Sequence, residues 1–94
     1  MIRKIVQYQV KKEKLNDVIQ AVREFVEAVH DQEPETVYTA YRAGPGWDFV
    51  HFMAFPDEEA EILHQSAPYT LKLTDILSPA CEQEPVYTEL FVIQ

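Results

Sequence analysis

Two histidines, His51 and His64, are the side chains of this 94-residue chain best suited to acid–base chemistry. Both lie in the segment FVHFMAFPDEEAEILHQS, where an apolar run stops at Pro56 and an acidic helix start leads to His64. The reference imidazole pKa of about 6.5 lies near working pH, so a histidine that faces a cavity can take a proton from a phenol. We predict His64 as the catalytic base and His51 as a donor that orients a ligand oxygen. The alternative for each is a structural histidine in the core or at a subunit interface.

Four further side chains are predicted to bind a ligand beside these histidines. Tyr41 and Tyr69 each offer a ring for packing and a hydroxyl for hydrogen bonding, which suits a flat aromatic molecule. Trp47 follows a tight glycine-proline turn and is predicted to be a lid or an interface residue. Arg42 could fix a carboxylate or an oxyanion. The alternatives are core aromatics for the tyrosines and a salt bridge for Arg42.

The sequence offers no pattern for a metal or a nucleotide. The three histidines, at 30, 51 and 64, have no short i, i+4 pairing of the kind that metal sites on helices use. Only two glycines occur, so a glycine-rich phosphate loop is excluded. Cys81 is the single cysteine and has no basic neighbour in the sequence that would activate it as a nucleophile. We therefore predict no metal and no cofactor.

Charge and composition restrict the partners. The net charge of −8 disfavours nucleic acid and anionic membrane surfaces, which repel an acidic protein. No apolar run approaches the roughly 18–20 residues that cross a bilayer, and no signal-peptide core follows Met1, which predicts a cytoplasmic protein. A chain of this length with 47% hydrophobic residues has more apolar surface than a small monomer usually buries. A homodimer is the expected state.

Hydrophobic periodicity divides the chain into one domain, residues 1–94, of alternating strands and helices. Strands are predicted at 2–10, 36–43, 48–55 and 86–93, and a helix at 15–30, where apolar residues recur at helical spacing. Asp57 is predicted to cap a second helix, in which His64 lies beside an apolar stripe of Ile62, Leu63 and Ala67. Pro68 breaks this helix, and a second amphipathic stretch runs to Pro79.

The resulting order is β-α-β-β-α-β, which predicts an α+β, ferredoxin-like fold with an antiparallel four-stranded sheet and helices on one face. The strand at 48–55 is apolar on both faces and should be central in the sheet. The face without helices needs another cover, and a second copy of the sheet is the simplest one.

Several sequence features occur together in a characteristic order. They are the opening strand MIRKIVQYQV, the pair Glu33-Pro34 after the first helix, the strand FVHFMAF, the acidic turn before His64 and Ser66, and the stretch to Leu77-Ser78-Pro79. In these features, over nearly its whole length, the chain resembles the antibiotic biosynthesis monooxygenase family of dimeric α+β barrels. It departs from the family pattern in having Glu35 after the Glu-Pro pair and Phe55 at the end of the third strand.

The resemblance implies a cavity between the sheet and the helices of each subunit. It also implies an oxygenase that needs no cofactor and acts on an aromatic or quinol-like small molecule. In such an enzyme His64 would deprotonate the substrate, whose anion then gives an electron to dioxygen without metal or flavin. Two alternatives stay open: a non-catalytic, small-molecule-binding or stress-related homodimer, and a haem-binding or haem-degrading protein. Gln7 and Thr74 replace residues of the haem-degrading branch and disfavour the last alternative.

Overall fold

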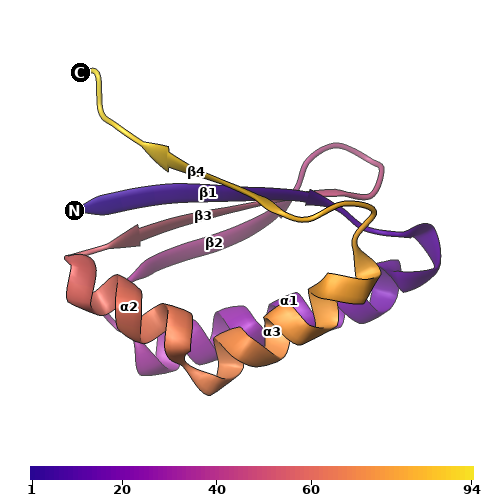
Figure 1. Cartoon of the computed structure of the whole chain (residues 1–94), viewed down its shortest axis with the longest axis horizontal. Helices are drawn as coiled ribbons and strands as arrows, with labels where there is room; N and C mark the ends of the chain where they lie inside the picture. Colours follow the sequence, from indigo (N-terminus) through magenta and orange to yellow (C-terminus); the bar gives the residue numbers. More distant parts are fainter.

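A four-stranded antiparallel sheet and a layer of three α-helices make up the protein (Figure 1). The computed structural model describes all 94 residues. The elements are β1 (Ile2–Gln9), a short 3-10 turn η1 (Lys12–Lys14), α1 (Leu15–Gln32), β2 (Val37–Arg42), β3 (Asp48–Phe55), α2 (Glu58–Ser66), α3 (Pro68–Ala80) and β4 (Val86–Leu90). The strands lie in the order β2-β3-β1-β4. The predicted α+β, ferredoxin-like arrangement is therefore confirmed, with β3 in the interior of the sheet.

Local sequence signals explain most element boundaries. The Asp57 side chain accepts a hydrogen bond from the backbone N–H of Ala60 at 2.8 Å, which caps α2 as predicted. Ala67 has an extended backbone (ψ 144°) and separates α2 from α3, which begins at Pro68. Proline is favoured at this first helical position because its missing N–H would have no partner there. The break lets α2 and α3 run in different directions along the sheet (Figure 1).

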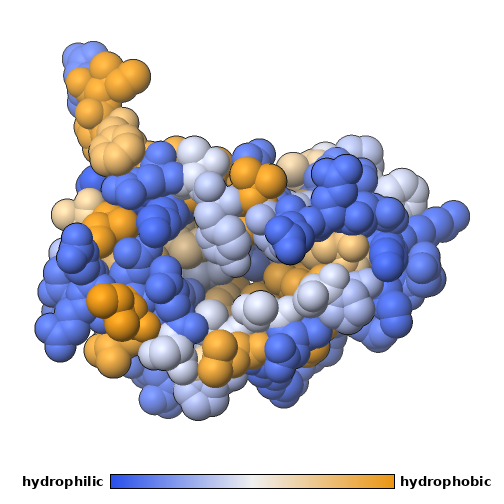
Figure 2. Space-filling view, viewed as in Figure 1, coloured by the Kyte–Doolittle hydropathy of each residue, from blue (hydrophilic) through white to orange (hydrophobic).

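The last strand is shorter than the predicted 86–93, and this part of the prediction is wrong. β4 ends at Leu90, which pairs with Arg3 near the start of β1. Because β1 begins at Ile2, little neighbouring strand remains for later residues to pair with. Phe91, Val92 and Ile93 lie beyond the sheet, between 65% and 101% exposed, and the C-terminal segment projects away from the body of the molecule (Figures 1 and 2).

The core lies between the inner face of the sheet and the helices. The strands contribute alternate residues, as the period of two requires, and α1 contributes one apolar stripe. The strand residues in this core are Val6, Tyr8, Tyr38, Phe49, Met53 and Phe55, and those of α1 are Val18, Val22, Phe25 and Val29. The helices thus cover the inner face of the sheet except at β4, where Tyr87 stays 65% exposed.

The opposite face of the sheet, called the outer face below, is not covered by any helix (Figure 1). Ile5, Val50 and Phe52 alternate with core residues along the two central strands and are only partly buried. On the edge strand β2, Val37 is 48% and Tyr41 56% exposed. The outer face therefore presents several apolar residues, with Gln7 and Thr39 between them. None of the helices combines the length and the apolar composition that a membrane span requires.

Helix α2 turns a different side to the core than its apolar residues predict. Ile62 and Leu63 are more than 60% exposed, whereas His64 is 4% exposed. An apolar patch over α2 is visible on the surface (Figure 2). The apolar residues Ile62 and Leu63 of the predicted stripe therefore face solvent, while His64 beside them faces the core. The helix instead buries Ala60 partly and His64 fully, because a carboxylate from the end of α1 binds the imidazole.

Candidate functional site

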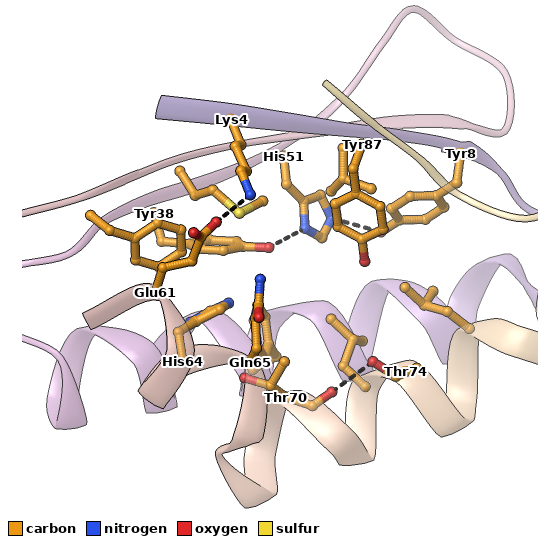
Figure 3. A pocket seen from close by; sticks show the side chains of 16 residues that line it. Lys4, Tyr8, Tyr38, His51, Glu61, His64, Gln65, Thr70, Thr74 and Tyr87 are labelled. Carbon is orange, nitrogen blue, oxygen red and sulfur yellow. Dashed lines mark hydrogen bonds and ion pairs between the residues drawn. The ribbon is translucent and has the colours of Figure 1, made fainter. Parts of the chain in front are cut away.

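A cavity of about 420 Å³ lies between the inner face of the sheet and the helices α2 and α3. Its opening is visible as a hollow between the two layers (Figure 2). Six apolar residues form part of its wall: Val6, Phe25, Met53, Phe55, Leu73 and Leu77. Ten more hydrophilic or aromatic residues complete the wall: Lys4, Tyr8, Tyr38, His51, Glu61, His64, Gln65, Thr70, Thr74 and Tyr87 (Figure 3). The volume falls within the range typical of small-molecule sites, roughly 300–1,000 Å³.

His64 enters this cavity from α2 and is held from behind by Glu33. The His64 Nδ1 and Glu33 Oε2 atoms are 2.8 Å apart, and Tyr69 donates its hydroxyl to the same oxygen at 2.5 Å. A carboxylate can only accept, so Nδ1 carries the proton in this pair. The other ring nitrogen, Nε2, has no hydrogen-bond partner within the chain, and in the neutral imidazole it is the nitrogen that can accept a proton. Figure 3 shows the ring extending toward the cavity.

Aromatic rings fix the orientation of the His64 imidazole. Phe55 and Phe25 lie with their ring centroids 5.0 and 5.8 Å from it, and Tyr38 stacks on it at 5.6 Å with an interplanar angle of 28°. Packing on several sides leaves the ring little freedom to turn away from Glu33. The base is therefore preorganised in an apolar surrounding.

His51 lies on the sheet side of the cavity, between two tyrosine hydroxyls. Its Nε2 is 2.6 Å from the hydroxyl of Tyr8 and its Nδ1 is 2.8 Å from that of Tyr38 (Figure 3). Burial lowers the pKa of His51 to about 4, so the ring is neutral at pH 7. Burial also raises the pKa of both tyrosines, which stay protonated. Since both ring nitrogens are taken, His51 has no free donor and reaches a ligand only through the tyrosines.

An ion pair lies at the border of the cavity. Lys4 on β1 pairs with Glu61 on α2, and both side chains are partly buried. This pair connects the sheet to α2 on the side of the cavity shown in Figure 3. Across the whole chain, no group of three or more His, Cys, Asp or Glu side chains is gathered in a way that could hold a metal ion.

The structure brings His64 and His51 together at one cavity but places the four other predicted residues outside its wall. Tyr69 supports Glu33 instead of facing the cavity. Tyr41 lies on the outer face, because it is one of the β2 residues whose alternation turns them away from the helices. Arg42 donates to the backbone carbonyls of Pro45 and Gly46 and so closes the turn after β2.

Trp47, the last of these four, is 37% exposed in the same turn. Its backbone carbonyl accepts a hydrogen bond from the N–H of Val10 at 2.8 Å, so the residue helps to anchor the turn to the end of β1. Its indole lines none of the cavity described here.

Tyr38, Glu33 and Tyr87 are site residues that the sequence analysis did not select. The period of two in β2 separates Tyr38 from Tyr41 but does not tell which of them faces the helices. Glu33 lies 31 residues from His64, and no local pattern indicates that the two meet. Tyr87 becomes part of the wall because β4 pairs with β1, which places it beside Val6.

Comparisons with known proteins identify the fold. No protein-family model matches the chain, and no curated protein sequence matches it either. A solved antibiotic biosynthesis monooxygenase superposes with a TM-score of 0.90 at 23% identity, covering 100% of both chains. A candidate antibiotic biosynthesis monooxygenase from Nitrosomonas europaea gives a TM-score of 0.89 at 18% identity, also over 100% of both chains.

A third match, a candidate enzyme of the same name from Caulobacter crescentus, has a TM-score of 0.89 at 17% identity. It covers 99% of this chain and 90% of the other. Identities this low establish a common architecture and leave the chemistry to the residues of each site. The chain thus has the fold of the proteins named antibiotic biosynthesis monooxygenases.

Proposed function

We propose that the protein is a monooxygenase that needs no metal or flavin and acts on an aromatic or quinol-like small molecule, with His64 as the catalytic base. One observation carries this proposal: a buried imidazole, bound at Nδ1 by Glu33, turns its free nitrogen toward a cavity whose surface is mostly apolar. A histidine held in this way is suited to take a proton from a bound molecule. The names of the structural neighbours agree with such chemistry.

The proposed reaction is written for an anthrone, in which a ring CH2 group becomes a carbonyl. His64 Nε2 takes one proton from this carbon, and the resulting anion gives one electron to dioxygen. The substrate radical and superoxide combine into a carbon-bound peroxide, which is protonated by the His64 imidazolium. The peroxide O–O bond then breaks as the second C–H bond is lost, giving the new carbonyl and one molecule of water. One dioxygen is consumed per substrate, and all four of its reducing electrons come from the substrate.

The surroundings of His64 suit this sequence. The aromatic and apolar residues of the wall limit the contact of a reactive anion with water. The Glu33 carboxylate stabilises the imidazolium that forms when His64 takes the proton. Neither residue needs to move, because the hydrogen bond between them is present before substrate binds.

The test is oxygen uptake by the wild type and a His64→Ala variant with anthrones and hydroquinones as substrates. Wild type is expected to consume dioxygen, and the variant to fall to the uncatalysed rate. Ile62→Ala, a change on the exposed side of the same helix, serves as the matched control and is expected to retain wild-type turnover. Binding of these compounds without oxygen uptake by wild type would contradict the proposal and indicate a binding protein.

We further infer that two copies of the chain associate through the outer face of the sheet. That face carries Ile5, Val50 and Phe52 without a helix over them, and the exposed Val37 and Tyr41 of β2 extend it. An apolar sheet face without a covering helix is a candidate site for a protein partner. A second copy offers the same surface in a two-fold arrangement.

A Phe52→Glu variant tests this association by light scattering coupled to gel filtration. The wild type is expected at twice the 10.9-kDa chain mass and the variant at the chain mass itself, because the buried charge would lack a partner. Leu63→Glu introduces the same charge on exposed α2, away from the outer face, and should leave the dimer intact. A wild type that stays at the chain mass up to high concentration would overturn the inference.

A further inference from the structure

The hydrogen atoms of the Tyr8–His51–Tyr38 chain can be counted. A neutral imidazole carries one N–H, and each tyrosine carries one O–H, which gives three hydrogens. The two hydrogen bonds of the chain, at 2.6 and 2.8 Å, use one hydrogen each. Whichever nitrogen of His51 is protonated, one tyrosine accepts from His51 and keeps its own hydroxyl hydrogen free. The three hydrogen-bonded residues Tyr8, His51 and Tyr38 therefore always offer one spare O–H donor.

Tyr38 is the tyrosine placed to hold this spare hydrogen. The two contacts, at 2.6 and 2.8 Å, fit either tautomer of His51, so the position of each tyrosine decides between them. Tyr38 also lies between the two histidines, with its ring centroid 5.6 Å from each. Tyr8 is stacked instead on Phe49, with centroids 5.2 Å apart. Of the two tyrosines, Tyr38 is therefore the one that can offer the spare hydrogen on the cavity wall beside His64.

We propose that Tyr38 donates a hydrogen bond to a carbonyl or phenolate oxygen of the bound molecule, and that His51 and Tyr8 position it for this purpose. The inference rests on the proposed function and refines its substrate class: the molecule has an acceptor oxygen at the sheet side of the cavity and its acidic hydrogen at the helix side, near His64. When His64 removes the proton, negative charge spreads to that oxygen. A preorganised donor there stabilises the anion.

A redox-inert probe pair tests the donor separately from turnover. 1-Tetralone has one carbonyl oxygen, and tetralin has nearly the same shape without it. The measurements are the affinity of both compounds and the infrared carbonyl stretch of 13C-labelled tetralone when bound. In wild type we expect the stretch at a lower frequency than in cyclohexane, as a hydrogen bond requires. Wild type should also bind tetralone more tightly than tetralin, and by a larger factor than a Tyr38→Phe variant does.

Tyr38→Phe is expected to return the bound stretch toward its cyclohexane frequency. It should reduce the preference for tetralone by about five- to tenfold, the worth of one net hydrogen bond. Tyr41→Phe, the same substitution on the same strand but on the outer face, should change neither value. His51→Gln is a second variant: its amide can accept from Tyr8 and donate to Tyr38, so it should keep the lowered stretch.

The inference is overturned if wild type does not bind tetralone or if Tyr38→Phe leaves the bound stretch unchanged. These results are independent of the proposed function. His64→Ala should abolish oxygen uptake while it preserves the lowered stretch. A protein without oxygenase turnover that still shows the Tyr38-dependent stretch would refute the oxygenase and retain the donor.

Discussion

Replacing Glu33 with glutamine is expected to lower oxygen-dependent turnover as strongly as removing the His64 imidazole, by roughly 10²–10⁴-fold. The carboxylate accepts from both His64 Nδ1 and the Tyr69 hydroxyl, so it fixes the proton of the imidazole on the side away from the cavity. A glutamine amide offers N–H donors as well as an oxygen. When its NH2 group faces Nδ1, the imidazole proton must move to Nε2, and the base is lost.

The measurement is kcat and KM for Glu33→Gln beside Glu35→Gln, which makes the same chemical change at an exposed position two residues away. The loss should appear in kcat, while the affinity for 1-tetralone stays near that of wild type because the cavity wall is unchanged. Thermal unfolding of both variants checks that each is folded. Equal kcat values for the two variants would show that Glu33 does not orient the base.

As the pH falls from 6.5 to 4, the free energy of unfolding of the wild type is expected to fall by about 3 kcal/mol more than that of a His51→Gln variant. Burial lowers the folded-state pKa to about 4, against 6.5 for the unfolded chain. Between these values the unfolded chain binds more protons than the folded protein. The stability is therefore complete above pH 6.5 and is lost as the pH falls through this window.

Urea unfolding of both proteins at pH 7, 5.5 and 4 measures this difference. The groups that face His51 are Tyr8 from β1 and Tyr38 from β2, and both remain protonated because burial raises the pKa of each. All other acids and bases are common to the two proteins, so the difference between their curves isolates residue 51. If the two stability curves run parallel from pH 7 to 4, His51 is not held neutral by burial.

Sequence patterns predicted the elements that depend on neighbours along the chain. β3 has the predicted bounds because Pro56 and the Asp57 cap end one element and begin the next within three residues. The sequence patterns failed where a residue distant in the sequence determines which side of an element faces the core. Ile62 and Leu63 are exposed on α2 because Glu33, from another element, determines which side of the helix turns inward.

The sequence analysis selected the two histidines of the candidate site but did not select the residues that contact them. The sequence shows where each histidine is, and the reference pKa of the imidazole indicates which chemistry it can perform. Which residues touch it follows from strand order and helix docking: Tyr38 reaches His51 because β2 pairs with β3, and Tyr8 reaches it from β1 on the other side. Tyr41, the tyrosine chosen instead of Tyr38, differs from it only in the face of the strand.

Glu33 joins the end of α1 to the distant segment that holds α2 and the start of α3, since its oxygen binds residues 31 and 36 positions further on. Such a junction requires the closure of a long loop, which has an entropic cost that contacts within one helix do not have. A collapsed chain with helices formed but not docked would keep its far-ultraviolet circular dichroism and still have no oriented base. The proposed turnover therefore depends on native tertiary structure. Fragments that end before α3 should lack this turnover.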